Sequence, residues 1–252
     1  MPAIIIIPAR YASTRFPGKP LCPLSGKPLI IHVYERSKQA KSALEVFVAT
    51  DNKLIYDAVE GCGGKAIMTS EGHQSGTDRI AEAVKILENT GYGIQDRDII
   101  VNVQGDEPMI QPEMIEDVIK LMEDERASIG TLAKKIEDAE EITDPNVVKV
   151  VFDEEGFALY FSRSPIPYHR DSQELTPNFY FKHIGIYAYR KDVLLRLSTL
   201  PSTRLEGIEK LEQLRALENG FKIKVKETGF ETIGVDTPTD LERVEKCLNI
   251  SL

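Results

Sequence analysis

The sequence is poor in cysteine and contains no long apolar run, and both absences narrow the class of protein. Cys22, Cys62 and Cys247 are odd in number, and no two of them have the spacing of a C-x-x-C motif or a zinc site. This pattern is typical of a reducing compartment, without structural disulfides or zinc. No stretch approaches the roughly 18 apolar residues of a membrane span. The apolar run 3–7 ends at Pro8 and is too short for a signal peptide. We therefore expect a cytoplasmic protein with no membrane partner.

Positive charge is also in deficit, because 31 lysines and arginines face 40 aspartates and glutamates, for a formal net charge of −9. An acidic chain repels nucleic acid, so we expect no nucleic-acid partner, and any phosphate binding must come from a local basic cluster. The rest of the composition is ordinary, since 42% of the 252 residues are apolar and 28% are charged. This length and composition predict a single domain over residues 1–252 with a sizeable core.

Short apolar runs alternate with amphipathic segments over the first half of the chain. The runs are rich in β-branched residues, which is typical of strands buried on both faces of a parallel sheet. They cover residues 4–7, 46–50, 65–68 and 99–103. Helices are predicted between and after them, over residues 28–40, 52–61, 77–88 and from about Pro112. Strands that alternate with helices form right-handed βαβ units. We therefore predict the α/β class, with a doubly wound, mostly parallel sheet.

The pattern changes after about Ser128, where antiparallel strands are predicted. Runs at 147–152 and 157–161 predict a hairpin, and a long alternating run covers 179–190. We expect these strands to form a smaller antiparallel lobe, over about 128–200, on the parallel core. The chain is then predicted to close with a helix at 205–217, a strand at 231–235 and a helix from Pro238.

A basic loop directly follows the first predicted strand. It carries Arg10, Arg15 and Lys19, and ligands of open α/β sheets bind beyond the carboxyl ends of the strands. Three cations and the backbone N–H groups around them can hold a triphosphate, although a solvated basic loop is the alternative. The loop is not of the Walker A type, because Pro20 follows Lys19 where serine or threonine is required. It also lacks the G-x-G-x-x-G pattern, so a dinucleotide cofactor is not expected.

Two aspartates follow predicted strands and indicate a magnesium site. Asp106 comes after 99–103 and Asp236 after 231–235, so both are expected at the sheet edge that faces the basic loop. Mg²⁺ is commonly held by one or two carboxylates together with phosphate oxygens. A turn residue is the alternative for Asp106. A helix cap is the alternative for Asp236, but Thr237 can supply that cap.

The alternating run that begins at Lys182 places two side chains with polar ends on one face of a strand. His183, Gly185 and Tyr187 share this face, and the intervening isoleucines lie on the other. Gly185 leaves room between the two tips. This arrangement suits a pocket for an acyl sugar, and an ordinary solvent-facing surface is the alternative.

Three further residues are candidates for the same pocket. Arg163 follows the predicted strand 157–161 and can pair with a substrate carboxylate, or it is a surface arginine. Glu212 and Gln213 lie beside the apolar stripe of the predicted helix 205–217. Their alternative is a surface position in which Glu212 pairs with Arg215, three residues on.

Seven short motifs run in order along almost the whole chain. They are PARYASTRFPGKPL from Pro8, GHQSGTDRIAE from Gly72, VNVQGDEP from Val101, YFSRSPIP from Tyr160, KHIGIYAYR from Lys182, IEKLEQLR from Ile208 and VDTPTDLE from Val235. Together they resemble the 3-deoxy-manno-octulosonate cytidylyltransferase family, the CMP-Kdo synthetases. Sialic-acid cytidylyltransferases share the fold, but their first loop differs from the Arg-Phe-Pro-Gly-Lys-Pro string found here. Ser164, Tyr168 and His169 depart from the residues that are usual in the family, alanine and tryptophan, and they bear on the sugar lobe.

The resemblance implies a nucleotidyltransferase fold, GT-A-like, and a function. The implied reaction is a Mg²⁺-dependent transfer of CMP from CTP to the anomeric hydroxyl of Kdo, with release of pyrophosphate, for lipopolysaccharide synthesis by a homodimer. The triphosphate is expected at Arg10, Arg15 and Lys19, and Mg²⁺ at Asp106 and Asp236. The cytidine is expected among Pro8, Ala9, Arg10, Ser75, Gly76, Thr77, Arg79 and Gln104. The sugar-acid pocket is expected to comprise Arg163, His183, Tyr187, Glu212 and Gln213.

The expected chemistry is direct in-line transfer. No covalent nucleophile with an adjacent base is visible, and the residues expected to be catalytic are Arg15, Lys19, Asp106 and Asp236. A cytidylyltransferase for a related sugar acid, such as 8-amino-Kdo or a nonulosonic acid, remains an alternative, as does a non-catalytic nucleotide-sugar-binding protein. A sugar transferase is expected to carry a D-x-D motif after a central strand, and the sequence from Asp106 to Pro108 does not match it.

Overall fold

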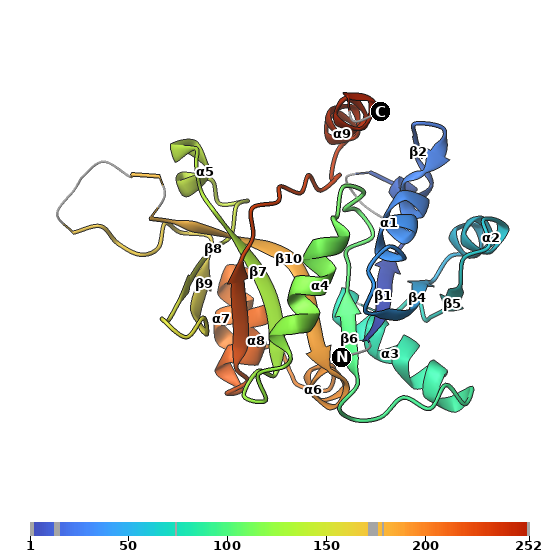
Figure 1. Ribbon diagram of the computed structural model, residues 1–252, viewed down its shortest axis with the longest axis horizontal. Helices are drawn as coiled ribbons and strands as arrows, with labels where there is room; N and C mark the ends of the chain where they lie inside the picture. Colours follow the sequence, from blue (N-terminus) through green and yellow to red (C-terminus); the bar gives the residue numbers. More distant parts are fainter. Residues whose placement is uncertain (1–2, 13–15, 74, 171–175, 178, 251–252) are drawn as a thin grey trace.

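The structure, a computed structural model, describes residues 3–12, 16–73, 75–170, 176–177 and 179–250 (Figure 1). The strands of its main sheet are β1 (Ala3–Ala9), β4 (Ala43–Thr50), β5 (Ala66–Met68), β6 (Ile99–Asn102), β7 (Ile129–Lys135), β8 (Lys149–Phe152), β9 (Ala158–Ser162), β10 (Phe181–Arg190) and β11 (Ile223–Glu227). The helices are α1 (Leu29–Ser37), α2 (Lys53–Gly61), α3 (Gly76–Asn89), α4 (Pro112–Leu121), α5 (Ala139–Thr143), α6 (Lys191–Leu197), α7 (Arg204–Glu209), α8 (Gln213–Glu218) and α9 (Pro238–Ile250). A short 3-10 helix (Lys19–Leu21) precedes the small hairpin of β2 (Pro23–Leu24) and β3 (Lys27–Pro28).

The main sheet is mostly parallel and doubly wound, which confirms the predicted fold class. Its strand order is β11-β7-β10-β6-β1-β4-β5. β1 pairs in parallel with both β4 and β6, while β10 runs antiparallel to its neighbours β6 and β7. The chain moves outward from β1 through β4 to β5 and then returns to the other side of β1 at β6. Such a reversal leaves a crevice beyond the carboxyl ends of the strands, where ligands of this architecture bind.

The segment 128–200 contributes strands to the same sheet. β10 lies between β6 and β7 in the middle of it, so the long alternating run is a central strand. The antiparallel hairpin of β8 and β9 is predicted correctly, and it joins the early part of β10 through the pairing of Lys149 with Lys182. The hairpin therefore stands beside β10, on the side away from β1 (Figure 1).

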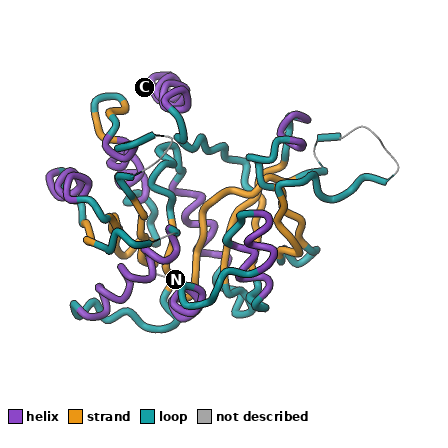
Figure 2. Tube along the Cα trace, turned by 180° about the vertical axis from the view of Figure 1, so that it is seen from behind, coloured by secondary structure: helices purple, strands orange, loops and turns teal. Residues whose placement is uncertain are grey.

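The β-branched run of β1 is buried on both sides because it separates two apolar cores. Ile5 and Ile7 pack in one core, which includes side chains of α1, α2, α4 and α9. Ile4 and Ile6 pack in the other, which includes side chains of α3, α6 and α8. Seen from behind, the strands run through the middle of the molecule with helices around them (Figure 2). Alternate residues of a strand thus bury themselves on opposite faces.

The single helix predicted over 205–217 is wrong, because the chain forms α7 and α8 with a break between them. Lys210 ends α7 in the left-handed conformation, with φ 55°, and its N–H bonds the carbonyl of Glu206. The guanidinium of Arg163 donates to the carbonyl of Glu209 at 2.8 Å and of Lys210 at 3.4 Å. A cation at the end of a helix satisfies carbonyls that lack intrahelical partners, so Arg163 stabilises this break.

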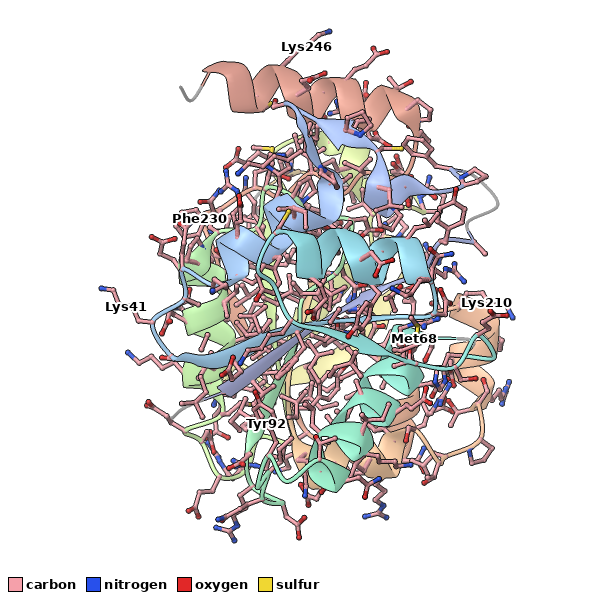
Figure 3. All side chains as sticks on the ribbon, turned by 90° about the vertical axis from the view of Figure 1, so that its right-hand side faces the viewer. Lys41, Met68, Tyr92, Lys210, Phe230 and Lys246 are labelled. Carbon is pink, nitrogen blue, oxygen red and sulfur yellow. The ribbon has the colours of Figure 1, made fainter. Side chains whose placement is uncertain are left out.

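The strand predicted over 231–235 is also wrong. After β11 the chain leaves the sheet and crosses the ends of the strands as an extended segment, which we call the C-terminal strap (residues 228–236) (Figure 1). The strap leads into α9, which lies over the β2–β3 hairpin with Lys246 directed away from the body (Figure 3). Val244 buries itself in the first core, and Ser25 N–H donates to Glu245 Oε1 at 3.1 Å. No helix in the described ranges is long and apolar enough to cross a membrane.

Candidate active site

A cavity of about 320 Å³ lies at the crevice beyond β1 and β6. It brings together the start of the basic loop, the N-terminus of α3, the loop after β6 and the end of the strap. Its lining comprises Pro8, Ala9, Arg10, Lys19, Pro20, His73, Ser75, Gly76, Arg79, Gln104, Gly105, Asp106 and Asp236. Most residues expected around the nucleotide therefore meet in one place. Arg15 lies outside the described residues, and Thr77 lines a neighbouring cavity.

Two local features shape this cavity. A Cβ at Gly105 would lie 2.7 Å from the carbonyl oxygen of Pro8, so only glycine lets the loop after β6 approach β1 this closely. Ser75 caps α3, because its side chain accepts a hydrogen bond from the Asp78 N–H at 3.1 Å. The N-terminus of a helix favours bound anions through its free N–H groups and dipole. The cavity is therefore suited to phosphate on its α3 side.

Lys19 lies between the two predicted metal ligands. Its Nζ is 2.7 Å from Asp106 Oδ2 and 3.3 Å from Asp236 Oδ1. The lysine side chain is 13% exposed, whereas the aspartates are 35% and 50% exposed, so the carboxylates open toward the cavity. Thr237 provides the α9 cap as predicted, since its hydroxyl accepts from the Asp240 N–H and its N–H donates to the Asp240 carboxylate.

The donor set at this point fits a divalent cation. Two carboxylates from distant parts of the chain converge on one positive centre, the Lys19 ammonium. Among the residues that the structure describes, no group of three or more histidine, cysteine, aspartate or glutamate side chains could hold a metal. Asp106 and Asp236 would therefore supply two ligands, and phosphate oxygens and water the others, as is common for Mg²⁺.

A third carboxyl group, which was not predicted as a site residue, lies directly behind Asp106. Glu107 is largely enclosed, and its Oε2 is buried without a hydrogen-bond partner among the described residues. Burial and the negative charge of Asp106 raise the pKa of Glu107 to about 8. In the sequence, only the position of Glu107 directly after Asp106 indicates a role at the site, because its burial depends on how the strap is placed.

Arg79 and His73 are held by acidic partners beside the cavity. The Arg79 guanidinium donates to Asp51 Oδ2 at 2.6 Å and to Thr69 Oγ1 at 2.6 Å. Its charge is thus already paired, and it fixes the loop before α3. His73, which was not predicted, contacts the Glu82 carboxylate through Nε2. Burial opposes ionisation, but hydrogen bonds from His73 and from the backbone leave the pKa of Glu82 lowered overall. His73 lies in the same sequence motif as Ser75, and this shared motif could have indicated that it lies at the cavity.

A second cavity, of about 140 Å³, adjoins the first and shares Gly76 and Gln104 with it. Its other lining residues are Thr77, Asn102, Ile129, Tyr187, Tyr189, Leu197, Glu212, Gln213, Arg215 and Ala216. Tyr187, Glu212 and Gln213 of the expected sugar pocket therefore lie together beside the first cavity. The two cavities meet at the start of α3.

Glu212 is oriented toward α3 and away from the surface. Burial raises its pKa, while hydrogen bonds with Ser75 and Thr77 oppose that shift. Its Oε1 is buried and has no hydrogen-bond partner in the described part of the chain. The surface alternative is wrong, because Arg215 instead pairs with Glu206, at 2.9 Å and 2.5 Å. Glu212 thus presents a polar atom inside the second cavity.

His183 and Arg163 do not line this second cavity. His183 and Tyr187 share a face of β10, as predicted, with ring centroids 5.3 Å apart. His183 Nε2 lies 3.0 Å from the Thr131 hydroxyl, and burial lowers the pKa of its imidazole to about 3. Arg163 donates to the Pro145 carbonyl at 2.8 Å in addition to the α7 carbonyls. Both residues therefore support the walls around the pocket in this structure.

The comparisons with known proteins all indicate a cytidylyltransferase. Residues 4–226 match the cytidylyltransferase family model. A 3-deoxy-manno-octulosonate cytidylyltransferase of Thermodesulfovibrio yellowstonii is 59% identical over 252 residues, which covers 99% of each chain. An 8-amino-3,8-dideoxy-manno-octulosonate cytidylyltransferase of Shewanella putrefaciens is 49% identical and covers 100% of each chain.

A solved structure matches over the whole length as well. The structure of CMP:2-keto-3-deoxy-manno-octonic acid synthetase complexed with CTP has a TM-score of 0.90 and 46% identity, with 100% of both chains covered. The family model, the sequence relatives and the solved structure agree. The chain belongs to the cytidylyltransferase family and, within it, to the 3-deoxy-manno-octulosonate cytidylyltransferases.

Proposed function

We propose that this protein transfers CMP from CTP to the anomeric hydroxyl of Kdo and releases pyrophosphate. The observation that carries the proposal is the shared edge of the two cavities at Gly76 and Gln104. A nucleotide in the first cavity and a sugar acid in the second would meet there. The curated relative that is 59% identical carries the name of this activity, and the related solved structure contains CTP.

The first cavity supplies the groups that bind and orient a triphosphate. Arg10, Lys19 and the N-terminus of α3 surround it with positive charge and N–H donors. Charge that develops on the leaving pyrophosphate is stabilised by fixed cations, and Lys19 is the described cation closest to the two aspartates. Arg15, from the same loop, is proposed to contribute in the same way.

Mg²⁺ is the proposed cofactor, held by Asp106 and Asp236. When bound, it would offset phosphate charge and make the attacking hydroxyl more nucleophilic. The Lys19 ammonium keeps the two carboxylates together, because it contacts both. The site residues therefore hold the donor set in place before the substrates arrive.

The second cavity is proposed to hold the sugar acid. The free Oε1 of Glu212 and the side chains of Tyr187 and Gln213 offer hydrogen bonds to sugar hydroxyls. Because Glu212 also bonds Ser75 and Thr77 at the start of α3, it links the sugar pocket to the phosphate-binding end of that helix. Such a link would align the sugar hydroxyl with the α-phosphate.

A homodimer in the cytoplasm, acting in lipopolysaccharide synthesis, is part of the proposal. Large apolar side chains are exposed on the outer hairpin and on α7, where Leu159 is 63% and Ile208 67% exposed. Exposed apolar groups of this kind often mark an association surface. Light scattering after gel filtration tests the dimer, and cell fractionation tests the compartment.

One alternative substrate is favoured by a specific relative. The protein that is 49% identical over the whole chain is an 8-amino-3,8-dideoxy-manno-octulosonate cytidylyltransferase. Pyrophosphate release from CTP and Mg²⁺, measured with Kdo, 8-amino-Kdo and a nonulosonic acid at equal concentration, separates these activities. We expect Kdo to give the highest kcat/KM. A higher value with 8-amino-Kdo would reassign the sugar, and release with none of them would favour a non-catalytic binding protein.

A further inference from the structure

The C-terminal strap carries Asp236 without the support of a strand ladder. Its start is anchored by Glu231, which pairs with Lys134 and, at 2.9 Å, with Lys182. Its end is joined to the loop after β6 by the bond from the Val235 N–H to the Asp106 carbonyl, at 2.9 Å. The course of the strap between these points must therefore depend on the side chains beneath it.

Glu107 fills the space beneath the middle of the strap. A Cβ at Gly234 would lie 3.2 Å from Glu107 Oε1, so the carboxyl packs directly against the strap backbone. The Thr232 side chain lies against the same carboxyl, and both residues line one small void. Glu107 therefore contacts the strap four and two residues before Asp236, and it is joined covalently to Asp106.

The far oxygen of Glu107 is buried without a partner. The part of the chain that the structure describes offers Oε2 no hydrogen-bond partner. Glu107 also lines a void of about 10 Å³, together with Gln104, Ile110, Ile184, Gly185, Ile186 and Thr232. A void near 10–15 Å³ is about the minimum for one water molecule. Glu107 also lines a larger cavity along the strap, together with Thr232 and Gly234.

Packing alone does not explain a carboxyl group at this position. A buried carboxyl oxygen without a hydrogen-bond partner is unfavourable, because it loses hydration that nothing in the described residues replaces. An apolar side chain would fill the space with less cost. Residues that lower stability in this way tend to serve the function of the site.

We propose that Glu107 is a positioning residue, which fixes the strap at Thr232 and Gly234 and thereby places Asp236 opposite Asp106. The inference rests on one part of the proposed function, namely that Asp106 and Asp236 bind the same divalent cation. Glu107 does not contact the cation or the substrates in this role. Its side chain sets the distance between two ligands that come from different segments.

Replacing Glu107 tests the inference through metal binding measured apart from turnover. Mn²⁺ binding in the presence of CTP is followed by electron paramagnetic resonance. Loss of a residue that orients metal ligands typically weakens metal affinity about 10–100-fold, and we expect this loss for Glu107→Ala. Glu107→Gln keeps the length and the acceptor for Thr232, so it should bind Mn²⁺ much as the wild type does. Glu227→Gln, an exposed acid of β11, is the control.

Thr232→Val tests the same contact independently, in case Glu107→Ala fails to fold. It removes the hydroxyl but keeps the shape, and it should also weaken Mn²⁺ binding. The double variant with Glu107→Ala should be little worse than Glu107→Ala alone, because both changes break one contact. Wild-type Mn²⁺ affinity in Glu107→Ala or Thr232→Val overturns the inference and leaves the proposed function intact. Absence of Mn²⁺ binding in the wild type would overturn the proposed metal site and the inference with it.

Discussion

Lys19 Nζ donates a hydrogen bond to Asp106 Oδ2 over 2.7 Å, although the lysine was predicted to bind phosphate and the aspartate to bind metal. Asp236 Oδ1 completes the cluster at 3.3 Å from the same nitrogen. The three residues come from the basic loop, the loop after β6 and the strap. The residues proposed to bind phosphate and metal are thus electrostatically coupled, and changing one group must affect the other.

Lys19→Ala should lower turnover more than it weakens CTP binding. The lysine is proposed to stabilise charge that shifts during the reaction, and it also lies between two carboxylates that repel each other. Loss of a fixed electrostatic contact of this kind costs about 2.7–4 kcal/mol, or a hundred- to a thousand-fold in rate. Steady-state kinetics and CTP titration give both quantities. Lys27→Ala, on an exposed lysine paired with Glu35, is the control, and near-normal turnover in Lys19→Ala would contradict this role.

Asp106→Asn and Asp236→Asn should each nearly abolish activity while the fold stays stable. The double variant should be little worse than either single variant, since residues that act as a unit are not additive. Activity should vanish with a chelator and return with Mg²⁺. Kinetics and thermal unfolding are measured on the same samples. An Asp236→Asn protein that stays active but melts earlier would mean that this carboxylate is structural.

Arg163→Ala should destabilise the protein, with a smaller effect on the KM for Kdo. Arg163 donates to the carbonyls of Pro145, Glu209 and Lys210. Hydrogen bonds to charged groups contribute about 1.5–3 kcal/mol, and the free energy of urea-induced unfolding should fall by this order. Arg97→Ala, on an exposed arginine, should change little. Unchanged stability with a raised KM for Kdo would instead assign Arg163 to the sugar carboxylate.

His183 predicts a pH dependence of stability. Burial lowers the pKa of this imidazole from its ordinary 6.5 to about 3, so between these values the unfolded chain binds a proton that the folded chain does not. Above pH 6.5 the imidazole is neutral in both states and does not lower the free energy of unfolding. As the pH drops from 6.5 toward 3, that free energy falls by up to about 1.4 kcal/mol per pH unit. His183→Gln should flatten the fall between pH 7 and 5, measured by urea unfolding, whereas the exposed His169→Gln should not. Equal slopes in all three proteins would contradict this prediction.

The sequence predicted the first half of the sheet and the crevice well, because strands buried on both faces leave short β-branched runs such as Ile4–Ile7. The strand order is not local information, so the sequence did not reveal that β10 lies in the middle of the sheet. The break at Lys210 escaped prediction because a left-handed lysine has no compositional signal. The partners of Arg163 are backbone carbonyls, which any sequence could supply.

Asp236 lies at the cavity, as predicted, although the strand predicted before it is wrong. The segment before it was predicted as a strand, yet it forms the strap and still delivers the carboxylate beside Asp106, through the Val235 backbone bond. Glu107 was missed because its enclosure depends on that strap. Arg15 lies outside the described residues, so its role stays a prediction.

Mass analysis of the products formed from CTP, Mg²⁺ and Kdo shows whether the protein makes CMP-Kdo. We expect a product with the mass of CMP-Kdo, with one pyrophosphate released for each molecule formed, and almost none of either product when Asp106→Asn replaces the wild type. Recovery of unchanged CTP and Kdo, or of free CMP without CMP-Kdo, would contradict this expectation.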